Sequence, residues 1–201
     1  MTKKNAFKSL LYIFITLFSI ALSAATCNEE SPNHKAEGDK YFDLNETPSL
    51  TRAQKNAIKA FIKPFTGKRL QGIATITECV GPERIAKEKT IHEKLKAKVS
   101  TLSDGQLLIK LDVYNQDKKI TYNETLKYFG KQTSQEIKKL NENEISIVSK
   151  YRKRRPGNSG SHAIFTEEII NLKSKKNTLT ISTIRYTSGY FAIQHERKLY
   201  F

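Results

Sequence analysis

From Leu70 to the end of the chain, apolar and polar residues alternate, and this period of two restricts the fold more than any other feature. It is clearest in residues 91–102 (IHEKLKAKVSTL), where four of the six odd positions are apolar and five of the six even positions are polar, three of them lysines. Successive side chains of a strand point to opposite faces, so the pattern predicts strands with one apolar and one polar face. About eight such segments follow one another at hairpin spacing.

Short polar segments join these strands, including Ser103-Asp104-Gly105, residues 115–118, 173–177 and 187–189. Residues 130–143 are interpreted as a polar connection with room for a helical turn. Consecutive antiparallel strands with one apolar face need closure or a cover. The sequence therefore predicts a mainly β fold, an up-and-down barrel of about eight strands or a strongly curved sheet. Its shape is similar to that of lipocalins, although the Gly-x-Trp signature of that family is absent.

One amphipathic helix is predicted ahead of the strands, at residues 51–63. Thr51 and Gln54 have capping-box spacing, and Pro64 ends the helical pattern. The predicted apolar face consists of Ala53, Ala57, Ile58, Phe61 and Ile62. We expect this helix to cap an open end of a single β-rich domain, residues 51–201.

The first 25 residues are typical of a signal peptide. A basic start precedes the apolar run Leu10–Leu22 and the small residues Ser23-Ala24-Ala25. The apolar run is shorter than the roughly 20 residues of a spanning helix, so an uncleaved anchor is the less favoured alternative. These features predict a mature chain that begins at Thr26 and is periplasmic or secreted, with residues 26–50 as a polar tail.

The chain has two cysteines, Cys27 and Cys79. In an exported protein an isolated pair most simply forms one disulfide. The alternative is lipid modification of Cys27, although the residues before it fit the lipoprotein pattern poorly.

The chain is strongly basic, and its charge is unevenly distributed. The net charge of +15 becomes +12 without the three lysines of residues 1–25, and residues 28–50 carry −4, so the rest carries +16. Such a surface attracts anionic polymers or lipid headgroups, whereas no motif indicates specific nucleic-acid binding, and membrane contact would be peripheral. The densest basic segment is a candidate anion site, with a solvated hairpin tip as the alternative interpretation: Arg152, Lys153, Arg154 and Arg155.

Several charged residues occupy the same alternate strand positions as the apolar side chains, so they are expected on the apolar face of the sheet. Such charges are costly unless they are paired or reach water, so they predict a partly hydrated ligand pocket inside the sheet. A wet rim, or a register shifted by bulges, would also explain them. The predicted ligand-binding residues are Glu93, Glu124, Glu167, Arg185, His195 and Arg197.

No motif indicates catalysis, a metal or another cofactor. The four histidines lack metal-ligand spacing, and there is no nucleophile elbow or glycine-rich phosphate loop. The leading hypothesis is an exported, non-enzymatic binding protein for a small amphiphile inside the barrel or for an anionic envelope component on the basic surface. The alternative is a structural or accessory envelope protein, including an integral outer-membrane barrel.

Overall fold

The computed structural model describes Cys27 and residues 29–32, 49–80, 87–114, 119–129, 135–154 and 163–201, with only the backbone for 152–154 and 163–165. The predicted signal peptide and most of the polar tail lie outside these residues.

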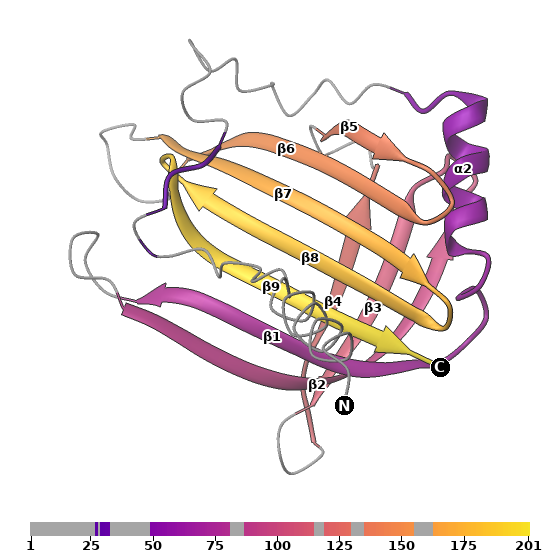
Figure 1. Ribbon diagram of the computed structural model, residues 1–201, viewed down its shortest axis with the longest axis horizontal. Coiled ribbons are helices and arrows are strands. Elements are labelled where there is room, and N and C mark those ends of the chain that lie inside the picture. The colour runs from indigo at the N-terminus through magenta and orange to yellow at the C-terminus, as the bar shows by residue number, and fades with distance from the viewer. Residues whose placement is uncertain are drawn as a thin grey trace, which may run out of the picture.

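The described residues form a single curled antiparallel sheet with one short helix, which confirms the predicted mainly β, strongly curved fold. Figure 1 shows the sheet as a half-barrel with α2 (Arg52–Ile62) standing at one end. The strands are β1 (Leu70–Val80), β2 (Lys87–Thr101), β3 (Leu107–Tyr114), β4 (Ile120–Tyr128), β5 (Gln135–Leu140), β6 (Glu144–Arg154), β7 (Ala163–Lys175), β8 (Thr178–Thr187) and β9 (Tyr190–Tyr200).

The strand order leaves two edge strands that run parallel to each other. In the described residues the order is β4-β3-β2-β1-β9-β8-β7-β6-β5, and every neighbouring pair is antiparallel. Nine is an odd number, so the two edge strands β4 and β5 run in the same sense along the sheet. The two edges could therefore meet only as a parallel pair, and in the described residues they are not paired with each other.

The end of the half-barrel next to α2 holds the main core. The capping box is confirmed, because Thr51 Oγ1 accepts from the Gln54 backbone N–H and Gln54 Oε1 accepts from that of Thr51. Of the predicted apolar helix face, Ala53 is exposed and Ala57 is half-buried. The largest fully buried side chains are Ile58, Phe61, Phe65, Leu70, Leu107, Ile109, Leu111, Ile145, Ile147, Leu172, Leu179 and Ile181.

The strand count differs from the sequence prediction. Residues 135–140 form edge strand β5, whereas 130–143 were expected to be a polar connection. Gln135 and Ile137 face the same side as Ser149 and Ile147 of β6, and a bulge follows between Ile137 and Lys139. The bulge interrupts the alternation, so the pattern is too short to detect in the sequence.

Residues 29–31, called here the strap, lie on the convex face and extend the sheet beside β9. Cys27 and Cys79 are joined, with Cα atoms 5.6 Å apart, which confirms the predicted pairing. Beyond the disulfide, the Phe191 N–H donates to the Glu29 carbonyl and the Ser31 N–H to the Gly189 carbonyl. In the part of the chain that is described, no helix has the length and apolar character needed to cross a membrane.

Candidate ligand pocket

The inner face of the half-barrel changes from apolar to polar along β6 to β9. In β8, Leu179 and Ile181 are followed by Thr183 and Arg185 on the same face. Because neighbouring strands are in register, the apolar halves gather under α2 and the polar halves gather at the other end. The same order appears in β6 (Ile145, Ile147, Ser149, Tyr151), β7 read backwards (Leu172, Ile170, Glu168) and β9 read backwards (Leu199, Arg197, His195), although the apolar Ile193 follows in β9.

Arg197 and Glu124 form an ion pair across the hollow. Three strands separate β9 from β4 in the sheet order, which would be roughly 19 Å in a flat sheet. Nevertheless Arg197 Nη2 lies 2.9 Å from Glu124 Oε2. The curl of the sheet is therefore what brings this pair together, and the pair spans the concave side.

A second ion pair lies on β6 to β8. Glu168 and Arg185 are cross-strand partners, and both Nε and Nη2 of Arg185 lie 2.7 Å from Glu168 Oε1. The Tyr151 hydroxyl donates to the same oxygen at 3.2 Å. Burial works against the charge of Arg185, but the carboxylate of Glu168 raises the pKa of the guanidinium above its ordinary value.

His195 is held as a neutral imidazole beside Arg197. Arg197 Nη2 lies 3.2 Å from His195 Nδ1, and a guanidinium can only donate, so Nδ1 accepts and the proton sits on Nε2. Burial, together with the positive charges of Arg197 and Arg185, lowers the pKa of His195 to about 4. The ring therefore carries no charge at neutral pH.

Two tyrosines of β4 add hydroxyl groups to this polar region. The Tyr122 hydroxyl donates to Glu93 Oε2 at 2.9 Å, and burial and the Glu93 carboxylate raise the pKa of Tyr122 to about 12. Burial also raises the pKa of Tyr128, which lies beside Thr183. Both hydroxyls stay protonated at neutral pH.

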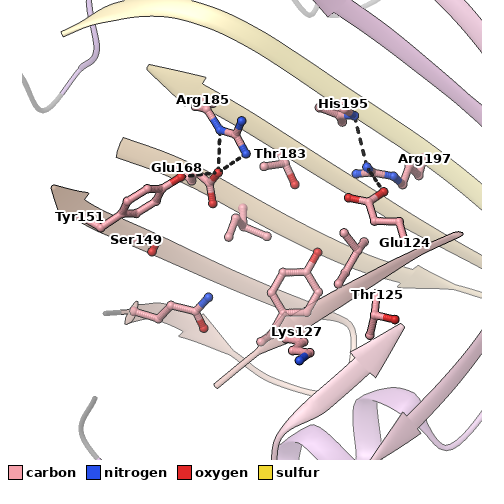
Figure 2. Close-up of a pocket in the computed structure, with 14 residues that line it drawn as sticks. Glu124, Thr125, Lys127, Ser149, Tyr151, Glu168, Thr183, Arg185, His195 and Arg197 are labelled. Carbon is pink, nitrogen blue, oxygen red and sulfur yellow. Dashed lines mark hydrogen bonds and ion pairs between the residues drawn. The ribbon is translucent and has the colours of Figure 1, made fainter. Parts of the chain in front are cut away.

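These groups surround a cavity of about 390 Å³. Figure 2 shows Glu124 and Thr125 of β4 on one side and the side chains of β6 to β9 on the other. The walls combine two arginine–glutamate pairs with apolar surface from Leu126 and Ile170. The lining residues are Glu124, Thr125, Leu126, Lys127, Tyr128, Gln135, Ser149, Tyr151, Glu168, Ile170, Thr183, Arg185, His195 and Arg197.

Five of the six predicted site residues lie on the inner face of the sheet. Four of these line the cavity, and Glu93 stands apart from them in its hydrogen bond to Tyr122. Arg197 and Arg185 each contact a glutamate, as expected for charges on this face. The five inward residues are Glu93, Glu124, Arg185, His195 and Arg197.

The inward placement predicted for Glu167 is wrong. Glu167 lies on the convex face, where it is buried under the strap, accepts from Ser31 Oγ at 3.0 Å and lies 3.9 Å from Lys150 Nζ. Its neighbour Glu168 takes the inward position opposite Arg185. The inward and outward positions of β7 were assigned one residue out of register, and such a shift exchanges the two faces of a strand.

The sequence prediction also missed several lining residues, namely Tyr128, Gln135, Ser149, Tyr151, Glu168 and Thr183. Tyrosine and threonine are ordinary strand residues, so they gave no functional signal. A signal for Glu168 was present, however. Ile170 and Leu172 alternate with Asn171 and Lys173, which assigns the even positions of β7 to the inner face.

The predicted anion site at Arg152, Lys153, Arg154 and Arg155 falls outside the described side chains, so its role stays a prediction. Among the residues with described positions, no three His, Cys, Asp or Glu side chains meet as a metal site would require.

A scan against protein-family models and a search of curated proteins gave no match. The function is therefore inferred from the chemistry of the hollow.

Proposed function

We propose that this chain is an exported, non-enzymatic binding protein that holds a small amphiphile in the hollow of the half-barrel. The ligand has an anionic head group, which binds Arg197. Its apolar part lies against Leu126 and Ile170, toward the apolar floor under α2.

The proposal is based mainly on the burial and the hydrogen bonds of Arg197. The residue is only 5% exposed, and it lines the cavity. Within the described residues both of its side-chain contacts, to Glu124 and His195, use the same nitrogen, Nη2. A guanidinium has five N–H donors, and buried donors without an acceptor are costly. A carboxylate or phosphate head group supplies the acceptor oxygens that fit Nη1 and Nε.

The polarity and volume of the hollow support an amphiphile over a purely polar ligand. Each of β6 to β8 changes from apolar to polar in the same direction, and β9 places two polar residues, Arg197 and His195, after Leu199. The apolar floor next to α2 and the polar mouth of the hollow therefore differ in chemistry. A cavity of about 390 Å³ also lies within the roughly 300–1,000 Å³ that is usual for small-molecule pockets.

The arrangement of the charged groups favours binding over catalysis. Glu124 and Glu168 are each held by an arginine. The Nδ1 lone pair of His195 faces the guanidinium of Arg197, so that nitrogen is unavailable as a general base.

Export is part of the same proposal. Residues 1–25 have the three regions of a signal peptide, and a disulfide between Cys27 and Cys79 is compatible with an oxidising compartment. We therefore propose a periplasmic or secreted location for the mature chain.

The proposal predicts that dodecanoate binds and that Arg197→Met weakens this binding by about tenfold or more, because a charged hydrogen bond is lost. Titration calorimetry with dodecanoate and with dodecanol measures the preference for the acidic head. Glu124→Gln is expected to bind dodecanoate at least as tightly as wild type, since a competing carboxylate is removed from Arg197.

Arg52→Met is the matched control, because Arg52 is an exposed arginine in the first turn of α2. Its affinity for dodecanoate should equal that of wild type. Thermal melting of each variant shows whether the fold is retained. Equal affinity of wild type and a folded Arg197→Met variant, or no dodecanoate binding by wild type, would refute an acid-binding pocket at Arg197.

A further inference from the structure

The convex face of β9, β1, β2 and β3 carries a group of exposed lysines, called here the lysine face. They occupy alternate positions, so they all point away from the hollow. Lys98 and Lys110 are direct cross-strand partners, and Lys198 and Lys94 flank Ile73 in one cross-strand row. The lysine face consists of Lys94, Lys96, Lys98, Lys110 and Lys198.

These lysines do not stabilise the sheet through ion pairs. None of the five has a carboxylate within 4 Å among the described residues, although Asp112 is the cross-strand partner of Lys96. Like charges directly opposite each other, as at Lys98 and Lys110, destabilise a sheet. A partner with negative charge would therefore remove a repulsion that the fold itself leaves in place.

Apolar and aromatic side chains stand among these lysines. Ile73 is 51% exposed and Tyr200 is 50% exposed, and Lys96 Nζ lies 4.8 Å from the centre of the Tyr114 ring. A shallow hollow of about 330 Å³ is lined by these residues together with Lys94. The surface therefore mixes cations with groups that prefer the interface between water and lipid.

We infer that the lysine face docks on the surface of an anionic lipid bilayer. The lysine ammonium groups contact lipid phosphates, and Ile73, Tyr114 and Tyr200 enter the headgroup region. A soluble polyanion would satisfy the charges equally well, but it would gain little from covering an exposed isoleucine. The lysine face lies on the surface of the sheet opposite the hollow. Only β9 contributes to both sites, with Arg197 facing the hollow and Lys198 facing outward.

Co-sedimentation with vesicles tests this inference, using phosphatidylcholine alone and an equimolar mixture with phosphatidylglycerol. The full-length mature chain is expected to bind the mixed vesicles, and less strongly as the salt concentration rises. Each lysine near an anionic surface strengthens binding by about fivefold. The variant Lys94→Gln/Lys96→Gln/Lys98→Gln/Lys198→Gln should therefore bind about a hundredfold more weakly or worse.

The matched control makes the same change in net charge at exposed lysines at the C-terminal end of α2 and at the junction of β7 and β8, Lys59→Gln/Lys63→Gln/Lys175→Gln/Lys176→Gln. It should lose only a small part of the binding. An equal loss in the two variants would overturn the inference, because net charge alone would then explain the attraction. Melting temperatures near that of wild type confirm that both variants are folded.

Ile73→Ser separates a bilayer from a polyanion. Ile73 is half-exposed, so its replacement should leave the fold intact. We expect the variant to bind the mixed vesicles more weakly while it is retained on heparin like wild type. Unchanged vesicle binding by Ile73→Ser, or retention on heparin without vesicle binding by wild type, would overturn docking on a bilayer.

Discussion

Loss of the Cys27–Cys79 disulfide is expected to lower the melting temperature by about 10 °C. The bond links residues 52 positions apart, and closing a loop of this length stabilises a fold by about 4 kcal/mol in the chain-entropy model. For a domain of this size, each kcal/mol corresponds to roughly 2–4 °C. Thermal unfolding of wild type and of Cys27→Ala/Cys79→Ala, both without reductant, measures the difference.

The disulfide also stabilises the fold locally, because it anchors the strap that follows Cys27. Without the bond, the interactions that hold residues 29–31 beside β9 include two backbone hydrogen bonds and the contact of Ser31 with Glu167. If the strap leaves, Glu167 loses a hydrogen bond and its cover on the convex face. Hydrogen exchange at the Phe191 amide, which donates to Glu29, should then speed up in the double variant.

The variant Ser31→Ala tests the contribution of the strap contact alone, because it leaves the disulfide in place. It removes one hydrogen bond to a buried carboxylate, so we expect a loss of about 2 kcal/mol at most. Its melting temperature should therefore fall less than that of the cysteine variant. Equal melting temperatures for wild type and the double cysteine variant would show that the bond contributes nothing to stability.

The fold could be predicted because, in most strands, the alternation of apolar and polar residues shows which side chains face the inside of the sheet. In β2, lysines and apolar residues alternate from Lys94 to Val99, and in the described structure Leu95, Ala97 and Val99 are buried while Lys94 and Lys96 are exposed. The capping box at Thr51 likewise depends only on local spacing. Both signals act within a few residues, so a single sequence contains them.

The sequence left a closed barrel and a strongly curved open sheet as alternatives, because the choice between them depends partly on the number of strands. A chain with eight strands could close with antiparallel neighbours throughout, whereas the described nine cannot. The strand that makes the number odd, β5, has six residues and a bulge. It was missed in the sequence, so the odd strand number was missed with it.

The site was predicted in part for the same reason. The alternation alone assigned Arg185, His195 and Arg197 to the inner face, since β8 and β9 pair without a register shift until after Arg185. The alternation of inward and outward residues says nothing about contacts across the hollow, such as that of Arg197 with Glu124, because these depend on how far the sheet curls. Glu167 was misplaced because apolar residues occur at both parities of β7, as at Ile169 and Ile170.

The seam between β1 and β9 joins the two halves of the sheet, and Gly72→Ala is expected to damage it. Gly72 lies opposite Leu199, and an added Cβ would stand 2.0 Å from the backbone oxygen of Lys198. A backbone oxygen cannot move aside as a flexible side chain can, so the strands must separate locally. Overpacking of this kind costs about 3 kcal/mol, and Gly72→Val should be worse.

Gly67→Ala is the matched control for this change. Gly67 has φ +75°, and an added Cβ would meet nothing within 4 Å, so only backbone strain of about 1 kcal/mol is expected. Urea unfolding of the two variants gives both losses of stability. Similar losses would mean that β1 and β9 absorb the extra atom and that the close approach is not required.

The same substitution links the seam to the proposed pocket. Arg197 lies two residues before Leu199 on β9 and pairs with Ala74 of β1, so a shift of the seam moves the guanidinium away from Glu124. A folded Gly72→Ala protein should therefore bind dodecanoate more weakly than wild type, although residue 72 does not line the cavity. Gly67→Ala should leave the affinity unchanged. Wild-type affinity in a folded Gly72→Ala protein would show that the position of Arg197 does not depend on this seam.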